Sequence, residues 1–151
     1  YADVPPEKLD LEIIESAAIE NMQHVSQCLK ACQALGVRFS LDDFGTGYSS
    51  LSYLKRLPTE TIKIDKSFVR DILHDQDDLA LTTAVVGLAR AFGRNVIAEG
   101  LESEAQGCLL MELGCEVAQG YFIARPMPIR EVASWVAGFE PPRAWLQPAC
   151  A

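Results

Sequence analysis

Short apolar runs alternate along this chain with longer segments in which apolar residues recur every three or four positions. The runs predict five β-strands, and the longer segments predict amphipathic helices between them. The expected strands are Leu9 to Ile14, Val37 to Asp42, Thr61 to Asp65, Asn95 to Ala98 and Glu116 to Ala118. The expected helices are Ile19 to Cys32, Ser49 to Arg56, a segment capped by Asp77 or Asp78 and ending at Phe92, Glu104 to Leu113, and Ile129 to Val136. Glycines at 36, 93 and 114 end three of these helices. Strands that each precede a helix imply parallel pairing with right-handed crossovers.

A polar residue stands at or just beyond the carboxyl end of every expected strand. These residues are Glu12, Asp42, Lys63, Glu99 and Gln119. In an open doubly wound sheet they would spread along an edge, whereas in a (β/α) barrel they would converge on one mouth. A solvated strand end explains any one of them, but five in succession favour convergence. The sequence therefore predicts an α/β fold of five βα units with parallel strands, forming part of a TIM-like barrel.

Asp42 and Asp43 are adjacent carboxylates at the point where a strand breaks into a glycine-containing loop, Phe44 to Ser50. Their mutual repulsion costs free energy unless a cation lies between them. A turn or a helix cap is the commoner role of such a pair. The acidic residues at neighbouring strand ends shift the balance, and a metal site is the leading interpretation.

Other chemical signatures are weak. Gly45-Thr46-Gly47 lacks the third glycine of a dinucleotide fingerprint and the Gly-Lys-Ser/Thr ending of a P-loop. No serine or cysteine lies in a nucleophile elbow. Neither His24 nor His74 has a partner at metal-ligand spacing, and the five cysteines form neither a disulfide framework nor a zinc pattern.

Composition and charge narrow the class of protein. The 151 residues fit one domain, and 49% hydrophobic with 23% charged residues is typical of a globular protein with a buried core. A net charge of -8 argues against a protein that coats DNA or RNA, although bound metal ions would let an acidic site act on a phosphate ester. No apolar stretch is long enough to span a membrane and no signal peptide precedes position 15, so we expect a cytoplasmic protein.

Five stretches carry a family resemblance by their order and spacing. They are Leu9-Asp-Leu-Glu-Ile-Ile-Glu-Ser16, Asp42-Asp-Phe-Gly-Thr-Gly-Tyr-Ser-Ser-Leu51, Ile62-Lys-Ile-Asp-Lys66, Ala98-Glu-Gly-Leu-Glu102 and Ala118-Gln-Gly-Tyr-Phe-Ile-Ala-Arg-Pro-Met-Pro128. Together they resemble motifs of the EAL-domain phosphodiesterases. The resemblance covers residues 1–139 and leaves an irregular tail over residues 140–151. It implies a modified TIM barrel that hydrolyses cyclic diguanylate, a bacterial second messenger, to the linear dinucleotide.

The resemblance also implies a role for each polar strand-end residue. Glu12, Asp42, Asp43 and Glu99 match metal ligands, with Asp43 expected to bridge two metals; Lys63 matches the lysine that orients or deprotonates the attacking water, and Gln119 a glutamine near the water. Glu15 and Glu102 match acids behind the ligands, with Glu15 anchoring the loop after the aspartate pair; the alternative interpretation of both is an exposed acid at a helix start. Hard oxygen ligands select Mg²⁺ or Mn²⁺, and two such ions about 4 Å apart suit phosphodiester hydrolysis. A lysine among carboxylates stays protonated, so we expect Lys63 to position the water more than to act as a free base.

This sequence departs from the family pattern at its beginning. The strand with the Glu-Ala-Leu signature and a later strand with a metal-binding asparagine have no counterpart here, and Ile14 replaces the usual threonine. Without the first three strands, two sheet edges and the barrel interior would be exposed, so we expect a homo-oligomer, most simply a symmetric dimer. Without two ligands, the isolated chain should be weak or inactive.

Two function classes follow from these observations. The first is the carboxyl-terminal part of a metal-dependent phosphodiesterase. The second is a noncatalytic remnant that binds nucleotide or another protein. A purely structural dimerisation unit explains the acidic cluster least well. The sequence assigns no residue to contact with the substrate.

Overall fold

The computed structural model describes residues 4–15, 22–46 and 51–146 of the chain. Strands alternate with helices throughout these ranges. The strands are β1 (Asp10–Ile14), β2 (Arg38–Phe44), β3 (Thr61–Ile64), β4 (Asn95–Glu99) and β5 (Ala118–Gln119). The helices are α2 (Met22–Gln33), α3 (Leu51–Arg56), α4 (Lys66–Arg70), α5 (Gln76–Ala91), α6 (Glu104–Leu113) and α7 (Ile129–Gly138), with short 3-10 helices η1 (Pro6–Lys8) and η2 (Arg143–Leu146). The predicted succession of five βα units is confirmed.

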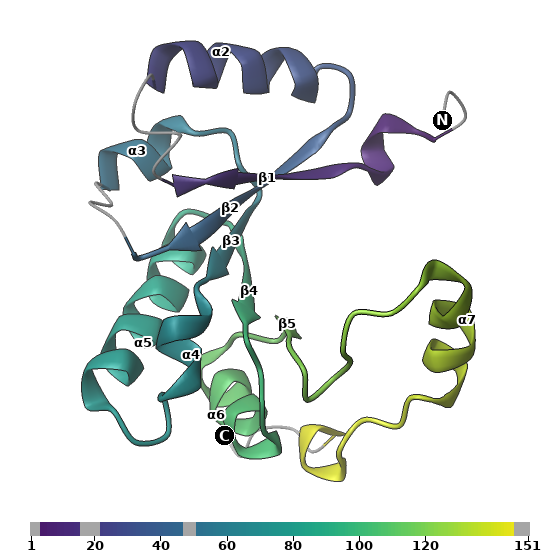
Figure 1. Cartoon of the computed structure of the whole chain (residues 1–151). Coiled ribbons are helices and arrows are strands. Elements are labelled where there is room, and N and C mark those ends of the chain that lie inside the picture. The colour runs from purple at the N-terminus through teal and green to yellow at the C-terminus, as the bar shows by residue number, and fades with distance from the viewer. Residues whose placement is uncertain (1–3, 16–21, 47–50, 147–151) are drawn as a thin grey trace.

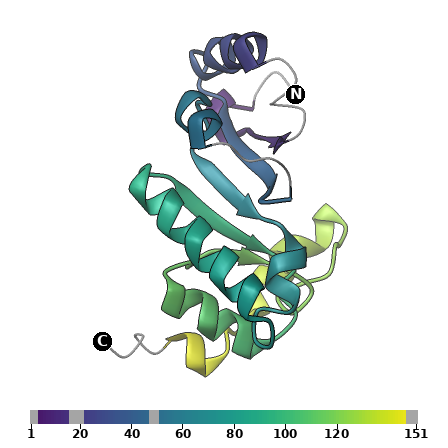
Figure 2. The ribbon, with the colours of Figure 1, turned by 90° about the vertical axis from the view of Figure 1, so that its left-hand side faces the viewer.

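The five strands form one parallel sheet in the order β1-β2-β3-β4-β5. Each strand pairs with the next in sequence, which is the result expected when every crossover is a helix of the same hand. Figure 1 shows the strands fanning out between α2 and α3 at one end and α5 and α6 at the other. In the quarter-turn view of Figure 2, helices cover the sheet on the side that faces the viewer. The described sheet is therefore an arc of a (β/α) barrel with its helices on the outside.

The hydrophobic core lies between the sheet and these outer helices. Ile62 and Ile64 of β3 are fully buried and belong to one cluster with Leu54 of α3 and Val86 of α5. Alternate residues of a strand point to opposite faces, so Lys63, between the two isoleucines, points away from the helices. The strand at the centre of the core thus presents a lysine on its other face.

Helix α6 has the bounds that the sequence predicts, because both of its ends carry strong local signals. Ser103 Oγ accepts a hydrogen bond from the Gln106 N–H at 3.3 Å, and Gln106 Oε1 accepts one from the Ser103 N–H at 2.9 Å. This reciprocal capping box fixes the first turn. Gly114 follows the last turn with a left-handed backbone, φ 89°.

Three local features differ from the sequence-based expectation. Helix α5 is capped by Asp75, whose carboxylate accepts hydrogen bonds from the N–H groups of Asp77 and Asp78, the residues predicted as caps. Helix α4 was not predicted, because five residues are too few to show apolar periodicity. Asp65 caps it by accepting from the Ser67 N–H at 2.9 Å. The expected irregular tail contains η2.

In the described ranges no helix combines the length and apolar character needed to cross a bilayer.

Candidate metal centre

The polar strand-end residues of the sheet meet around Lys63. Its Nζ lies 2.7 Å from Glu12 Oε1 on β1, 3.1 Å from Asp42 Oδ1 on β2 and 2.6 Å from Glu99 Oε1 on β4. Gln119 on β5 joins the group because its Nε2 donates to Glu99 Oε1 at 2.6 Å. Each of the five strands therefore contributes one side chain to a single connected cluster. Such convergence is expected at the mouth of a barrel.

Lys63 is a buried cation held by carboxylates. Its side chain is 4% exposed. Burial lowers the pKa of Lys63, but its interactions with Glu12, Glu99 and Asp42 raise it by more, so the net shift is upward. Lys63 is therefore an ammonium group at neutral pH and acts as a hydrogen-bond donor.

The carboxylate of Asp42 is only partly satisfied by this cation. Its Oδ1 is buried and accepts no hydrogen bond, although the Lys63 ammonium lies 3.1 Å away. The contact is thus an ion pair without the directionality of a hydrogen bond. A buried carboxylate oxygen without a donor is costly, and it is free to coordinate a cation.

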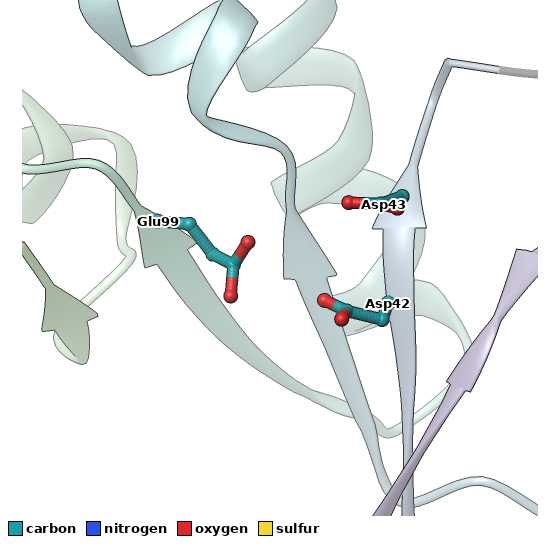
Figure 3. A group of neighbouring side chains, drawn as sticks. All are labelled: Asp42, Asp43 and Glu99. Atoms are coloured by element: carbon teal, nitrogen blue, oxygen red, sulfur yellow. The ribbon is translucent and has the colours of Figure 1, made fainter.

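Both aspartates of the adjacent pair face the same way because β2 is irregular where they occur. The pairing register of β2 with β3 shifts between Leu41 and Phe44, and Asp43 has a left-handed backbone with φ 54°. In a regular strand two consecutive side chains would point to opposite faces, whereas a bulge re-aims one of them. Figure 3 shows Asp42 and Asp43 both directed from β2 toward Glu99 on β4.

These three residues form a group that fits a divalent cation. Asp42, Asp43 and Glu99 each offer a carboxylate oxygen, and these oxygens lie within 4.8 Å of one another. Burial raises the pKa of Asp43, and the nearby charges of Asp42 and Asp65 raise it further. Crowded, half-buried carboxylates are the donor set that hard ions such as Mg²⁺, Mn²⁺ or Ca²⁺ prefer.

Asp65 belongs to this neighbourhood, although the sequence analysis did not single it out as a site residue. Its carboxylate accepts from the Ser67 N–H and hydroxyl at the start of α4, and its charge acts on Asp43. Burial raises the pKa of Asp65, but the hydrogen bonds from Ser67 and Lys66 and the charge of Lys66 together lower it by more. The signal was present, because Asp65 lies on the polar face of the strand expected from the sequence, together with Lys63 and in the same motif.

The two acids expected behind the ligands lie in different surroundings. Glu15 is 5% exposed, and its Oε2 accepts a hydrogen bond from the Gly45 N–H at 3.1 Å. This contact ties the residue after β1 to the loop that follows Asp43. Glu102 is exposed and lines the wall of an adjoining cavity instead of contacting Lys63.

The cavity beside the cluster has a volume of about 670 Å³. Glu99 and Gln119 form part of its wall, which continues to Tyr121 and Arg125. The guanidinium carbon of Arg125 lies 4.5 Å from the centre of the Tyr121 ring, a cation–π arrangement. A planar cationic and aromatic wall next to the candidate metal centre suits a planar, anionic ligand such as a nucleotide.

A parallel sheet with a cluster of carboxylates and a lysine at its carboxyl ends is the arrangement of sites in (β/α) barrels. Comparison with known proteins specifies the family. The family profile described as "EAL domain" matches residues 1–126. The chain therefore belongs to the EAL-domain family, as its motifs predict.

Relatives in sequence and in structure agree with this assignment. MucR of Pseudomonas aeruginosa, described as a bifunctional diguanylate cyclase/cyclic di-GMP phosphodiesterase, is 46% identical over 132 residues, which cover 87% of this chain and 19% of MucR. The structure of the MucR phosphodiesterase in complex with c-di-GMP matches with a TM-score of 0.82 at 45% identity, covering 85% of this chain and 52% of that one.

Two further solved structures extend the comparison. The EAL domain of Mycobacterium smegmatis DcpA matches with a TM-score of 0.84 at 39% identity, covering 91% of this chain and 62% of that one. Klebsiella pneumoniae BlrP1 with manganese and c-di-GMP matches with a TM-score of 0.77 at 34% identity, covering 83% of this chain and 32% of that one. These matches confirm the predicted fold class. The chain spans about a fifth of the length of the curated relatives that it matches.

Proposed function

We propose that these residues supply part of the catalytic centre of a metal-dependent phosphodiesterase that hydrolyses cyclic di-GMP to the linear dinucleotide. The observation that carries the proposal is the collection of one side chain from each strand around the buried Lys63. The description of MucR as a cyclic di-GMP phosphodiesterase, and its structure with c-di-GMP, support the choice of substrate.

The carboxylates Glu12, Asp42, Asp43 and Glu99 would hold the divalent cations, which we propose to be Mg²⁺ or Mn²⁺. Their oxygen donors fit hard ions, and Asp43 would be the ligand that two such ions share. Such ions, when bound, lower the pKa of water and neutralise charge on phosphate oxygens. BlrP1 has been solved with manganese and with calcium, which supports a divalent cation as the class of cofactor.

The chain's own residues would position the reactants. Lys63 donates hydrogen bonds as an ammonium group, and it would orient and polarise the attacking water beside the phosphodiester. Gln119, tethered to Glu99, would hold the same water from the β5 side. Through Gly45, Glu15 would fix the loop after the aspartate pair. The cavity beyond Gln119 would receive the remainder of the nucleotide.

We further propose that the 151-residue chain alone turns over cyclic di-GMP weakly or not at all. The match to the MucR structure covers 52% of that chain, so the other half of that structure has no aligned counterpart among these residues. A complete two-metal geometry needs every ligand in place. Noncatalytic binding is the alternative function, and it predicts affinity for the nucleotide without product.

Single-turnover assays with excess protein, cyclic di-GMP and Mn²⁺ test the proposal by chromatographic detection of the linear dinucleotide. We expect slow, chelator-sensitive product formation that Asp43→Asn lowers by on the order of 10²-fold. Asp77→Asn, which removes a charge from the exposed start of α5, is the matched control and should leave the rate unchanged. Calorimetric binding without product would favour the noncatalytic function. If the protein neither binds cyclic di-GMP nor forms product, both the catalytic and the noncatalytic function are refuted.

We also propose that the chain associates with a second copy through its sheet edge. Strand β1 is an edge of the described sheet, and its Leu11 and Ile14 are 47% and 52% exposed. An exposed edge with apolar side chains is a template for pairing. Light scattering should report a dimer that Leu11→Lys dissociates, whereas a monodisperse wild-type monomer would contradict the proposal.

A further inference from the structure

The carboxyl-terminal segment η2 (Arg143–Leu146) lies beyond the residues matched by the family profile, yet it is docked on α6. Figure 1 shows it in yellow beside that helix. The indole Nε1 of Trp145 donates to the backbone oxygen of Glu104 at 3.1 Å. The ring lies directly over Gly107, where any added Cβ would collide with it. The surface of α6 at Gly107 is therefore shaped to receive an indole.

The other side of the Trp145 indole contacts the turn that follows β5. The ring of Phe122 lies 5.5 Å from the indole, centroid to centroid, at an interplanar angle of 59°. Tilted aromatic pairs at this separation are favourable beyond the area that they bury. The backbone N–H of Phe122 also donates to the Leu101 oxygen at 3.0 Å. Phe122 is thus held twice, once by its backbone and once by its ring.

The same turn forms a wall of the candidate site. Tyr121 precedes Phe122, and Arg125 stacks on the Tyr121 ring; both line the cavity beside Glu99. Phe122 and Trp145 do not line that cavity. Since Tyr121 and Phe122 are consecutive in a tight turn, holding the Phe122 ring against Trp145 also fixes the direction in which Tyr121 projects.

We propose that Trp145 is a positioning residue for the candidate site. It holds Phe122 on the outer side of the turn, and through Phe122 it holds the Tyr121–Arg125 pair on the inner side, where the pair forms the cavity wall. The identity of the ligand that this wall contacts, a guanine nucleotide, rests on the proposed function. The ordering of the turn by Trp145 rests only on the contacts of the chain.

Hydrogen exchange followed by mass spectrometry tests the ordering without any nucleotide. In Trp145→Ala, peptides covering residues 119–126 should exchange about tenfold faster, while peptides of β3 and β4 stay unchanged. Gly107→Ala should give the same local effect with the indole still present, because the added Cβ occupies the surface of α6 on which the indole packs. Trp145→Phe should restore most of the protection. Leu146→Ala, at a 68% exposed position of the same segment, is the matched control.

The outcomes of the exchange experiment are distinct. Faster exchange across β3 and β4 as well would show a general loss of stability and would overturn the proposal. Unchanged exchange in residues 119–126 for both Trp145→Ala and Gly107→Ala would also overturn it. Local acceleration in both variants, reversed by Trp145→Phe, supports it.

A second measurement tests the consequence for the ligand. Trp145→Ala should weaken the binding of cyclic di-GMP about fivefold by calorimetry in the presence of Mn²⁺, because the Tyr121–Arg125 wall is less ordered. The single-turnover rate at saturating nucleotide should stay that of the wild type. Unchanged affinity in the variant would overturn the link to the site. If the wild type binds no cyclic di-GMP, the proposed function fails, and the exchange result alone decides the role of Trp145.

Discussion

A buried cation, Lys63, and a half-buried one, Arg94, occupy opposite ends of the sheet, and their surroundings differ. At the carboxyl ends, Lys63 contacts the carboxylates of three neighbouring strands. At the amino ends, Arg94 precedes β4, and its guanidinium donates to uncharged oxygens of the described residues. Those oxygens are the backbone carbonyls of Leu54, Leu57 and Thr59 and the Thr59 hydroxyl.

The pKa shifts of these two cations run in opposite directions. Burial lowers the pKa of Arg94, and no anion opposes the effect, whereas the carboxylates more than offset the burial of Lys63. Arg94 satisfies carbonyls of α3 and of the segment that leads from α3 to β3, so its charge serves the fold. Lys63 faces more negative charge than it neutralises. The comparison teaches that the end of this sheet that carries the candidate site is the one whose charges are not balanced locally.

The largest expected effect is the loss of the amino-end cation. Arg94→Met should lower the free energy of unfolding by about 3 kcal/mol, because several buried carbonyls lose their donor. Urea denaturation measures the change, and Mn²⁺ should not restore it. Arg130→Met, at an 80% exposed side chain, should stay within about 0.5 kcal/mol of the wild type. A loss below about 1 kcal/mol for Arg94→Met would break the comparison.

Removal of the carboxyl-end cation should have a smaller effect that depends on metal. In a chelator, Lys63→Met should cost about 2 kcal/mol, because the carboxylates around residue 63 then repel one another. Added Mn²⁺ should restore most of this stability by replacing the lost positive charge. Equal effects of Mn²⁺ on Lys63→Met and Arg94→Met would contradict the distinction between the two ends.

The pH dependence of the Lys63 contribution follows from the direction of its shift. Folding raises the pKa of Lys63, so its stabilisation is complete below the unfolded value of about 10.4 and is lost only as pH rises through the higher folded value. The difference in stability between wild type and Lys63→Met in chelator should therefore be flat from about pH 6 to 9. A fall within that range would indicate that Lys63 titrates near neutrality.

A smaller effect is expected behind the aspartate pair. Glu15→Gln should cost about 1 kcal/mol, since a charged acceptor of the Gly45 N–H becomes neutral. The affinity for Mn²⁺ should fall severalfold by calorimetry, because the loop after Asp43 loses its anchor. Glu112→Gln, on the exposed surface of α6, is the matched control. Unchanged affinity in Glu15→Gln would remove Glu15 from the site.

The smallest effect concerns the reactivity of a thiol at the amino end. Cys115 is 2% exposed, and burial raises the pKa of its thiol, so little of the reactive thiolate forms. Iodoacetamide should label the exposed Cys28 before the buried Cys115, which mass spectrometry measures. Arg94→Met should speed the labelling of Cys115, and Lys63→Met with Mn²⁺ should not. Equal labelling of Cys28 and Cys115 in the wild type would contradict the burial of Cys115.

The order of the sheet and the bounds of α6 could be predicted because both depend on signals close together in sequence. The βα repetition dictates parallel neighbours, and the cap at Ser103 with the glycine at 114 delimits one helix. The gathering of polar strand ends was also predictable, because parallel strands bring their carboxyl ends to one edge.

Features that depend on distant partners could not be predicted in this way. The position of Lys63 between its carboxylates depends on the register of four strands, and the direction of Asp43 depends on a local shift in that register. Arg94 reaches carbonyls 35 to 40 residues away. Trp145 contacts a helix 41 residues earlier along the chain. No short-range pattern records these contacts.

Two separate requirements limit the residues that evolution tolerates at position 43: the left-handed backbone conformation and the proposed coordination of a cation. The backbone conformation admits glycine, asparagine and aspartate with little strain. Of these three, aspartate offers a cation a negative charge and two oxygens, asparagine one neutral oxygen, and glycine no side-chain oxygen. Family members that lose activity but keep the fold should therefore carry asparagine or glycine at this position. The residue at this one position would then separate inactive members of the family from active ones.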